Sequence, residues 1–440
     1  MRQICIVVLE LLLILALLQI IRDMIIINVG IVKYGNYHKV ETILQQKNIY
    51  IPDLCVMIAA LNEYKELIDT IKWIKTIPYP GKLEIYIVTS NKEKCDVKKT
   101  TMDFIDEYIT NEGGEEIIHI HCPEKDGNKA SQLNYVLKRE KSRLLKSRSY
   151  IAIYDADSRP EKETFSEFIE MVNRVKIETG KLPVVIQQPS LFLKNYNKIP
   201  WTMKIEAVCM MRRVFGIEIP NMVKTQNRNR KIPVYSYCVG HGMFVKTSFL
   251  YENGLLPEPH EDVPFGQKMC IKNIPIYPLP AFDNCEVAKS LKELIRQSGR
   301  WFLNSLLVWK IVKQELEHPM SSKFRTICMA IKGLNDTFTW AHYAISLFNT
   351  CLLIILNRLP LYFLGILISL WYLDVGIGSI IVMCNKVKTQ VNITYRMQVL
   401  NFLLSPMREL LRFIGVIKGI IYMIRGTKSG IVNVMPKAER

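Results

Sequence analysis

The chain has 440 residues, long enough for one globular domain plus additional segments, and 49% of its residues are hydrophobic. It carries 58 Lys and Arg against 41 Asp and Glu, a formal net charge of +17, which suits anionic lipid or a phosphate-rich substrate. A nucleic-acid partner is not expected, because the basic residues form no stripe interleaved with aromatic residues and the chain contains membrane-type segments.

The 11 Cys residues are scattered singly along the chain. They include no Cys-x-x-Cys pair and no Cys/His cluster at zinc-ligand spacing. This usage is typical of reduced thiols on a cytosolic domain. We therefore expect neither disulfides nor a structural zinc site.

The first predicted element is a membrane anchor over residues 1–32. Ile4 to Ile21 contains one charged residue, Glu10, and with its continuation toward Val32 it is long enough to cross the hydrocarbon core. A cleaved signal peptide is the alternative, but Glu10 interrupts the apolar region and no Ala-x-Ala-like site follows it. We expect the anchor to be retained.

The region 52–310 is predicted to be an α/β catalytic domain with a mostly parallel sheet. Short apolar or β-branched runs alternate there with helical patterns. Open α/β sheets bind ligands at the carboxyl ends of their strands, so polar residues that follow strands are the candidate site residues. The predicted strands are Cys55–Ala60, Leu83–Val88, Ile117–Cys122, Tyr150–Tyr154, Pro183–Gln188 and Cys238–Val245.

Three groups of polar residues follow predicted strands or turns in the first half of this domain. Asn62 and Glu63 come just after the first strand and could hold a base or ribose, although Asn is also a good helix cap. Lys129 lies near a helix start whose free amides could receive a phosphate, although a solvated Lys is the default interpretation. Asp155 and Asp157 alternate on an extended segment, so both could hold one hard divalent cation; a solvated turn is the alternative.

Two further groups lie near the end of the domain. Glu261 and Asp262 follow a Pro-rich turn, and we predict Asp262 to be a general base because such a base needs an accessible carboxylate. Gln297, Arg300 and Trp301 lie on a probable helix, where Trp offers a flat apolar face and Arg can pair with a diphosphate. The alternative for this last group is an interfacial Arg-Trp pair whose polar ends reach water.

The last third of the chain is predicted to be membrane-associated. Two transmembrane helices are expected within 334–384, from Leu334–Leu356 and Leu359–Cys384. The segment 398–425 has apolar residues at helical spacing interrupted by charges, which indicates an amphipathic interfacial helix, with a fourth crossing as the alternative. Residues 426–440 form a basic tail. Lys386, Lys388 and Arg396 follow the last crossing, which favours a multi-pass cell-membrane protein with a cytosolic catalytic domain.

Taken in order, the motifs of the central domain resemble those of the family-2 glycosyltransferases, particularly the membrane-integrated branch that includes cellulose, chitin and hyaluronan synthases. The resemblance spans roughly Cys55 to Trp301. It rests on five motifs, namely Ala60-Leu61-Asn62-Glu63, the lysine-bearing helix start Gly127 to Asn134, Asp155-Ala156-Asp157, Glu261-Asp262, and Gln297 to Trp301 as Gln-x-x-Arg-Trp.

The resemblance implies a GT-A-like nucleotide-sugar-binding domain, a nucleotide-diphosphate sugar donor, and Mg²⁺ or Mn²⁺ held by Asp155 and Asp157. It further implies inversion at the anomeric carbon, with the metal and Lys129 or Arg300 stabilising the departing diphosphate and Asp262 deprotonating the acceptor hydroxyl. One departure concerns the end of the second strand. There the family often has an acidic pair that contacts the base, whereas this chain reads Val88-Thr89-Ser90-Asn91, leaving Asn91 or Asp96 as candidate replacements.

Three functions are compatible with this pattern. The first is a synthase that extends a growing polysaccharide at the membrane, and the second is a transferase that adds one sugar to a lipid-linked acceptor. The third is a non-catalytic membrane scaffold on a degenerate transferase domain, for which only the missing Asp argues.

Overall fold

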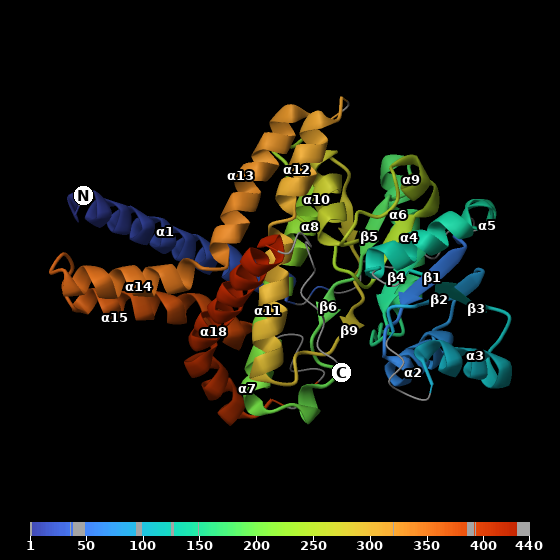
Figure 1. The fold of residues 1–440 in the computed structure, drawn as a ribbon, viewed down its shortest axis with the longest axis horizontal. Coiled ribbons are helices and arrows are strands. Elements are labelled where there is room, and N and C mark those ends of the chain that lie inside the picture. Colours follow the sequence, from blue (N-terminus) through green and yellow to red (C-terminus); the bar gives the residue numbers. More distant parts are fainter. Residues whose placement is uncertain are drawn as a thin grey trace.

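The computed structural model describes residues 2–35, 37, 49–93, 99–124, 127–147, 149–319, 321–384, 391 and 393–428. Asp96, Lys386, Lys388 and the predicted tail from residue 429 onward lie outside these ranges. An α/β domain carries an arm of helices that projects to one side and contains α1, α14 and α15 (Figure 1).

The core of the α/β domain is a seven-stranded sheet in the order β3-β2-β1-β4-β7-β5-β8. The first four strands are parallel, β7 is antiparallel to β4 and β5, and β5 and β8 are parallel. The strands are β1 Leu54–Ala59, β2 Leu83–Ser90, β3 Ile117–Cys122, β4 Tyr150–Asp155, β5 Val185–Gln187, β7 Met243–Lys246 and β8 Ile276–Pro278. A separate two-stranded sheet pairs β6 Ser190–Leu191 with β9 Asp283–Asn284.

The predicted α/β architecture with a mostly parallel sheet is confirmed. The largest difference in strand bounds concerns Cys238–Val245, where the strand begins only at Met243. The residues before it form a loop that ends at Gly242, whose φ of 63° does not continue a strand. Strands β6, β8 and β9 were not predicted, because two or three residues are too few to produce an alternating pattern.

Two hydrophobic cores cover the two faces of the sheet. Along β1, Leu54, Val56 and Ile58 face one core while Cys55 and Met57 face the other, as the alternation of side chains along a strand requires. The first core takes its helical residues from α2 Tyr64–Lys75, α3 Thr101–Glu112 and α6 Thr164–Thr179. The second takes them from α4 Lys129–Arg139, α7 Trp201–Arg213, α8 Ile219–Thr225, α10 Val263–Ile271 and α12 Val308–Glu317, and also from the end of α1.

Within the described residues, two helices are long and apolar enough to cross a membrane, Gln3–Tyr34 within α1 (Arg2–Tyr34) and Tyr362–Val382, which begins with α15 (Tyr362–Trp371) and ends with α16 (Ile377–Val382). The predicted single helix over 334–356 is divided. It is split between α13 Lys323–Thr339 and α14 His342–Ile355, which meet at 61° and together would make one bent span. The break follows Trp340, whose indole packs edge-on against Phe302 on the catalytic domain.

One acidic residue within the membrane-type segments, Asp374, has close partners. Asp374 accepts hydrogen bonds from Arg212 of α7 and from the Tyr343 hydroxyl of α14, and all three side chains are buried. A buried carboxylate in such a position is stable only when its charge is paired and hydrogen-bonded. Asp374 thus attaches the arm to the catalytic domain rather than facing lipid.

The last helix, α18 (Tyr395–Lys428), crosses α11 (Leu291–Ser305) in the middle of the molecule (Figure 1). A Cβ atom on Gly415 would lie 2.6 Å from Ser298 Cβ, and one on Gly419 would lie 3.0 Å from the Gly299 carbonyl oxygen. The two backbones are therefore in direct contact at these glycines. On the exposed side α18 presents Leu403, Met407, Ile414, Ile417 and Ile421, as an amphipathic helix does, and α18 is not among the described helices apolar enough to cross a membrane.

Candidate active site

The candidate site lies where β1 and β4 end side by side. Ala59, the last residue of β1, pairs with Asp155, the last residue of β4. In the sheet, the parallel strand β2 lies on the β1 side of this pair, and the antiparallel strand β7 lies on the β4 side. Ligands of open α/β sheets bind at such a switch point, so Asn62, Glu63 and Asp157 emerge at the expected edge.

Lys129 is surrounded by acceptors at this edge. It is the first residue of α4, which starts with a capping box formed by Asn128 and Ser131. The Lys129 ammonium lies 2.5 Å from Asp155 Oδ1, 2.5 Å from the Gly240 carbonyl oxygen and 3.2 Å from Glu261 Oε1. Burial by itself lowers the pKa of Lys129, but the carboxylates of Asp155 and Glu261 outweigh it and raise that pKa. Lys129 is therefore a fixed positive charge between two acidic segments.

Asp262 belongs to the same group of side chains. A Cβ atom on Gly240 would lie 2.9 Å from Glu261 Oε1 and 3.1 Å from Asp262 Oδ2, so only glycine lets this loop approach both carboxylates. Asp262 is the N-cap of α10, and its Oδ1 accepts a hydrogen bond of 2.6 Å from the Val263 amide. Burial and the neighbouring Glu261 charge raise the pKa of Asp262 to about 7, against the lowering effect of that amide and of Lys129.

Asp157 lies two residues beyond the end of β4 and is held by a different segment. Its carbonyl oxygen accepts a hydrogen bond of 2.6 Å from the Lys194 ammonium, which also lies 3.9 Å from Glu286. The structure thus brings Asp155, Glu261 and Asp262 together around Lys129, while Lys194 fixes the backbone of Asp157.

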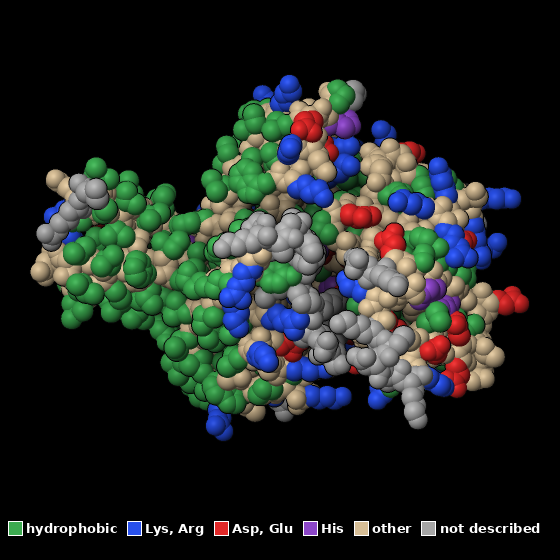
Figure 2. Space-filling model, in the orientation of Figure 1, with side chains coloured by type: hydrophobic (Ala, Val, Ile, Leu, Met, Phe, Trp, Pro, Cys, Tyr) green, Lys and Arg blue, Asp and Glu red, His purple; other side chains and the backbone are tan. Residues whose placement is uncertain are grey.

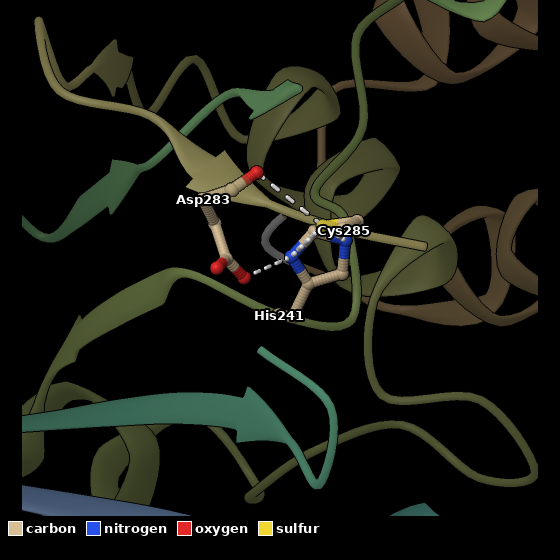
Figure 3. A group of neighbouring side chains, drawn as sticks. All are labelled: His241, Asp283 and Cys285. Carbon is tan, nitrogen blue, oxygen red and sulfur yellow. Dashed lines mark hydrogen bonds and ion pairs between the residues drawn. The ribbon is translucent and has the colours of Figure 1, made fainter. Parts of the chain in front are cut away.

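A second compact group, which the sequence did not single out, consists of His241, the residue after Gly240, together with Asp283 and Cys285 (Figure 3). His241 Nδ1 lies 2.8 Å from Asp283 Oδ2, and the Cys285 sulfur lies 3.5 Å from His241 Nε2. All three ligand atoms lie within 4.8 Å of one another, which is compact enough for a metal ion. In the structure hydrogen bonds join the three side chains to one another. The Gln187 side chain also donates to the His241 carbonyl oxygen at 2.8 Å, and this bond fixes the loop that carries Gly240.

The protonation of this second group follows from its burial. Burial lowers the pKa of His241, but the neighbouring Cys285 and the hydrogen-bonded Asp283 carboxylate together outweigh this effect and raise that pKa. Burial also raises the pKa of Cys285 to about 12, so its thiol stays protonated near neutral pH. No spacing pattern could have revealed the group, because His241 and Cys285 are 44 residues apart in sequence.

The region after β1 shows which residues stand where a nucleotide would be expected. Asn62 has a left-handed φ of 56° and does not cap α2, whose N-cap position is held by Glu63 without a side-chain capping hydrogen bond. The backbone amide of Asn62 instead donates to Glu93 Oε1 at 2.9 Å. Asn91, one candidate replacement for the missing Asp, bonds through its side chain to His121 and to the Pro123 carbonyl oxygen. Glu93 is therefore a carboxylate near this motif that sequence reasoning missed.

The helix α11 places Gln297, Arg300 and Trp301 between the catalytic domain and α18. The half-buried Trp301 packs against the cluster formed by Phe302, Trp340 and Val416. Burial lowers the pKa of His260, and the positive charge of Arg300 lowers it further. Arg300 therefore lies near His260, which precedes Glu261 in the chain. The Oε1 atom of Gln297 is buried and has no hydrogen-bond partner among the residues that the structure describes.

Comparisons with known proteins identify the family and the fold. The model of the family described as "Glycosyltransferase like family 2" matches residues 52–304. The solved mannosyltransferase PcManGT of Pyrobaculum calidifontis, in complex with GDP-Man and Mn²⁺, has a similar fold, with a TM-score of 0.55, 14% identity, and coverage of 94% of this chain and 99% of that chain. Residues 1–349 of S. aureus TarS, solved in complex with UDP-GlcNAc, have a TM-score of 0.41 at 12% identity. The match covers 86% of this chain and 92% of that chain. No curated protein matches the sequence.

Proposed function

The chain belongs to glycosyltransferase family 2, whose model covers more than half of it, and from this premise we propose that it is an inverting transferase acting at a membrane. The donor is a nucleotide-diphosphate sugar, and the acceptor is a growing polysaccharide. One observation carries the proposal: Asp155, Lys129, Glu261 and Asp262 meet at the edge of the sheet where β1 and β4 end.

The proposed roles follow from the chemistry of these groups. Asp262 removes the proton of the acceptor hydroxyl, because its pKa of about 7 lets it exist as a carboxylate and take up a proton near neutral pH. Lys129 and Arg300 bind the diphosphate, since both carry a positive charge at neutral pH. Asn62 and Glu63 contact the nucleotide, and Glu261, Gln297 and Trp301 line the remaining donor or acceptor space.

Asp155 and Asp157 are the residues that would hold Mg²⁺ or Mn²⁺. Carboxylate oxygens are the ligands that these hard cations prefer. In the structure the Asp155 carboxylate is paired with the Lys129 ammonium. The similar mannosyltransferase was solved with Mn²⁺. A bound divalent cation would supply charge neutralisation for the departing diphosphate.

A transferase that adds a single sugar to a lipid-linked acceptor is the second candidate function. It is favoured by the arm, because two helices, or three with the bent pair, are few to enclose a polymer within the described part of the chain. In either case we propose a multi-pass cell-membrane protein whose catalytic domain faces the cytosol, consistent with the cationic residues that follow the last predicted crossing.

The test of the proposed function is incubation of the purified full chain with a panel of radiolabelled nucleotide sugars. We expect one donor to be turned over, with incorporation into a product of many units. Products one sugar longer than the acceptor would replace the polysaccharide proposal with single addition. Absence of turnover with every donor, in protein that retains its fold, would instead support the non-catalytic scaffold.

The pH dependence of transfer should report Asp262. As the base must be ionised, kcat/KM is expected to rise with pH through about 7 and to be lost as the pH falls below it. Glu261→Gln removes the like charge that raises this pKa, so the midpoint should move to lower pH. The measurement is kcat/KM from pH 5 to 9, with the exposed Glu107→Gln as a control that should leave the midpoint in place. An unchanged midpoint in Glu261→Gln would contradict the assignment.

A further inference from the structure

A basic pocket lies between α8 and the loop that follows it, α10, and α13. Its lining includes Lys224 of α8, Asn227 and Arg230 of the loop, Asn273, and Arg325 of α13. Each of these side chains carries hydrogen-bond donors, and three of them are cationic. No carboxylate lines the pocket in the described part of the chain.

The cations of this region are not neutralised by neighbouring acids. In the ranges that the structure describes, neither Lys224 nor Arg230 forms an ion pair, and the same holds for Lys332 on α13. Burial lowers the pKa of Lys224, and the positive charges of Arg230, Arg22 and Lys332 lower it further. The Lys224 ammonium makes a long contact of 3.4 Å to the neutral side chain of Asn221. Four like charges thus face one another without a counter-ion among the described side chains.

Arg325 has a different role, because its guanidinium is already occupied. It donates to the carbonyl oxygens of Cys270, Ile271 and Arg230 at 2.6, 2.9 and 2.7 Å. These bonds hold the loop that carries Arg230 against α10. Arg325 therefore builds the wall of the pocket, while the charges of Lys224, Arg230 and Lys332 remain to be compensated by an anion.

The position of these cations relative to the apolar surfaces indicates where the anion comes from. The apolar part of α1 from Gln3 to Ile21 spans about 28 Å, close to the hydrocarbon thickness of a bilayer, and Arg22 is the next residue. On α13, Phe324, Ile327, Ile331 and Leu334 lie on one face and are 52–64% exposed, beside Lys332. Hydrophobic side chains cover the projecting arm and the adjoining side of the molecule (Figure 2).

We propose that this pocket binds the phosphate of an anionic lipid headgroup, with Lys224 and Arg230 as its cationic ligands and the acyl chains against the apolar face of α13. A phosphate oxygen matches the free donors, and lipid at the level of Arg22 brings it to the pocket. The inference rests on the proposed membrane association. It does not depend on the transferase activity, so it can fail while the proposed enzyme function stands.

The test uses the purified full chain in nonionic detergent, titrated with micelle-borne phosphatidylglycerol while the midpoint of thermal unfolding is followed. Phosphatidylglycerol is expected to raise the midpoint in a saturable manner, because a ligand of the folded state stabilises it. The double variant Lys224→Gln, Arg230→Gln should need at least tenfold more lipid for half of the effect. Arg228→Gln, Lys231→Gln is the matched control, since both residues are exposed, flank Arg230 and do not line the pocket.

Several outcomes would overturn the proposal. These are an equal loss in the control variant, an unchanged response in the pocket variant, or an equal stabilisation by phosphatidylcholine. Inorganic phosphate that binds as tightly as the lipid would show that the pocket takes a free anion instead. If the double variant is less stable before lipid is added, Arg230→Gln alone repeats the titration, with at least a threefold loss expected and an unchanged response counting against the pocket.

Discussion

Asp262→Asn is expected to lower the rate of sugar transfer by a factor of about 10²–10⁴, the usual contribution of a general base. The amide cannot take up the acceptor proton, although it keeps the size of the side chain and an oxygen that can still accept the Val263 amide at the start of α10. The fold and the membrane association should therefore remain. The measurement is donor turnover by the purified variant at saturating acceptor, with the unfolding midpoint as a check on structure.

Asp69→Asn is a matched control for this variant, because Asp69 is an exposed carboxylate of α2 on the same domain. It should retain the turnover of the unmodified chain. A rate for Asp262→Asn within tenfold of that value, which corresponds to about 1.4 kcal/mol of transition-state stabilisation, would remove Asp262 from the role of base. An unchanged pH midpoint near 7 in Asp262→Asn would also contradict the role, since an amide does not titrate.

Asp155→Asn is expected to reduce transfer by a factor of about 10²–10³, as the loss of one electrostatic contact to a departing group does in other enzymes. The substitution removes the carboxylate that contacts Lys129 at 2.5 Å and one of the two proposed cation ligands. Activity should therefore require more Mg²⁺ or Mn²⁺ for its half-maximal value. The measurement is a metal titration of donor turnover, starting from protein treated with a chelator.

The two variants serve as controls for each other in this titration. Asp262→Asn should keep the metal requirement of the unmodified chain while its rate is low, whereas Asp155→Asn and Asp157→Asn should shift the requirement. Activity that survives a chelator would refute the assignment of the paired Asp residues. An equal shift in all three variants would mean that the effect is a general disturbance of the site.

The strand pattern made much of the catalytic domain predictable from sequence. Buried parallel strands such as β4 are continuous apolar runs that end in polar residues, so the pattern alone places Asp155 at a strand end. The first four predicted strands agree with the observed ones to within two residues at each end. The order of the motifs then identified Glu261 and Asp262 as candidate site residues. Their position in the sequence does not show that they lie beside Lys129 in the fold.

Contacts between distant segments could not be predicted, because they depend on how the chain packs rather than on local pattern. The grouping of His241 with Asp283 and Cys285 arises from the pairing of two very short strands beside a glycine loop. Glu93 escaped notice because it lies in a turn after β2 and is recognised only by its bond to the Asn62 amide. The division between α13 and α14 was hidden by a continuous apolar composition, although Trp340, which packs against Phe302, lies at the bend.

The direct backbone contact between α11 and α18 has a mechanical consequence. Elsewhere in a protein interior, side chains can adopt other rotamers and absorb a small displacement, but Gly415 and Gly419 have no side chain to yield. A roll or tilt of α18 must therefore carry α11 with it, together with Arg300. In the proposed membrane-associated protein, a change in the depth of α18 would therefore also move α11 and the residues that it carries.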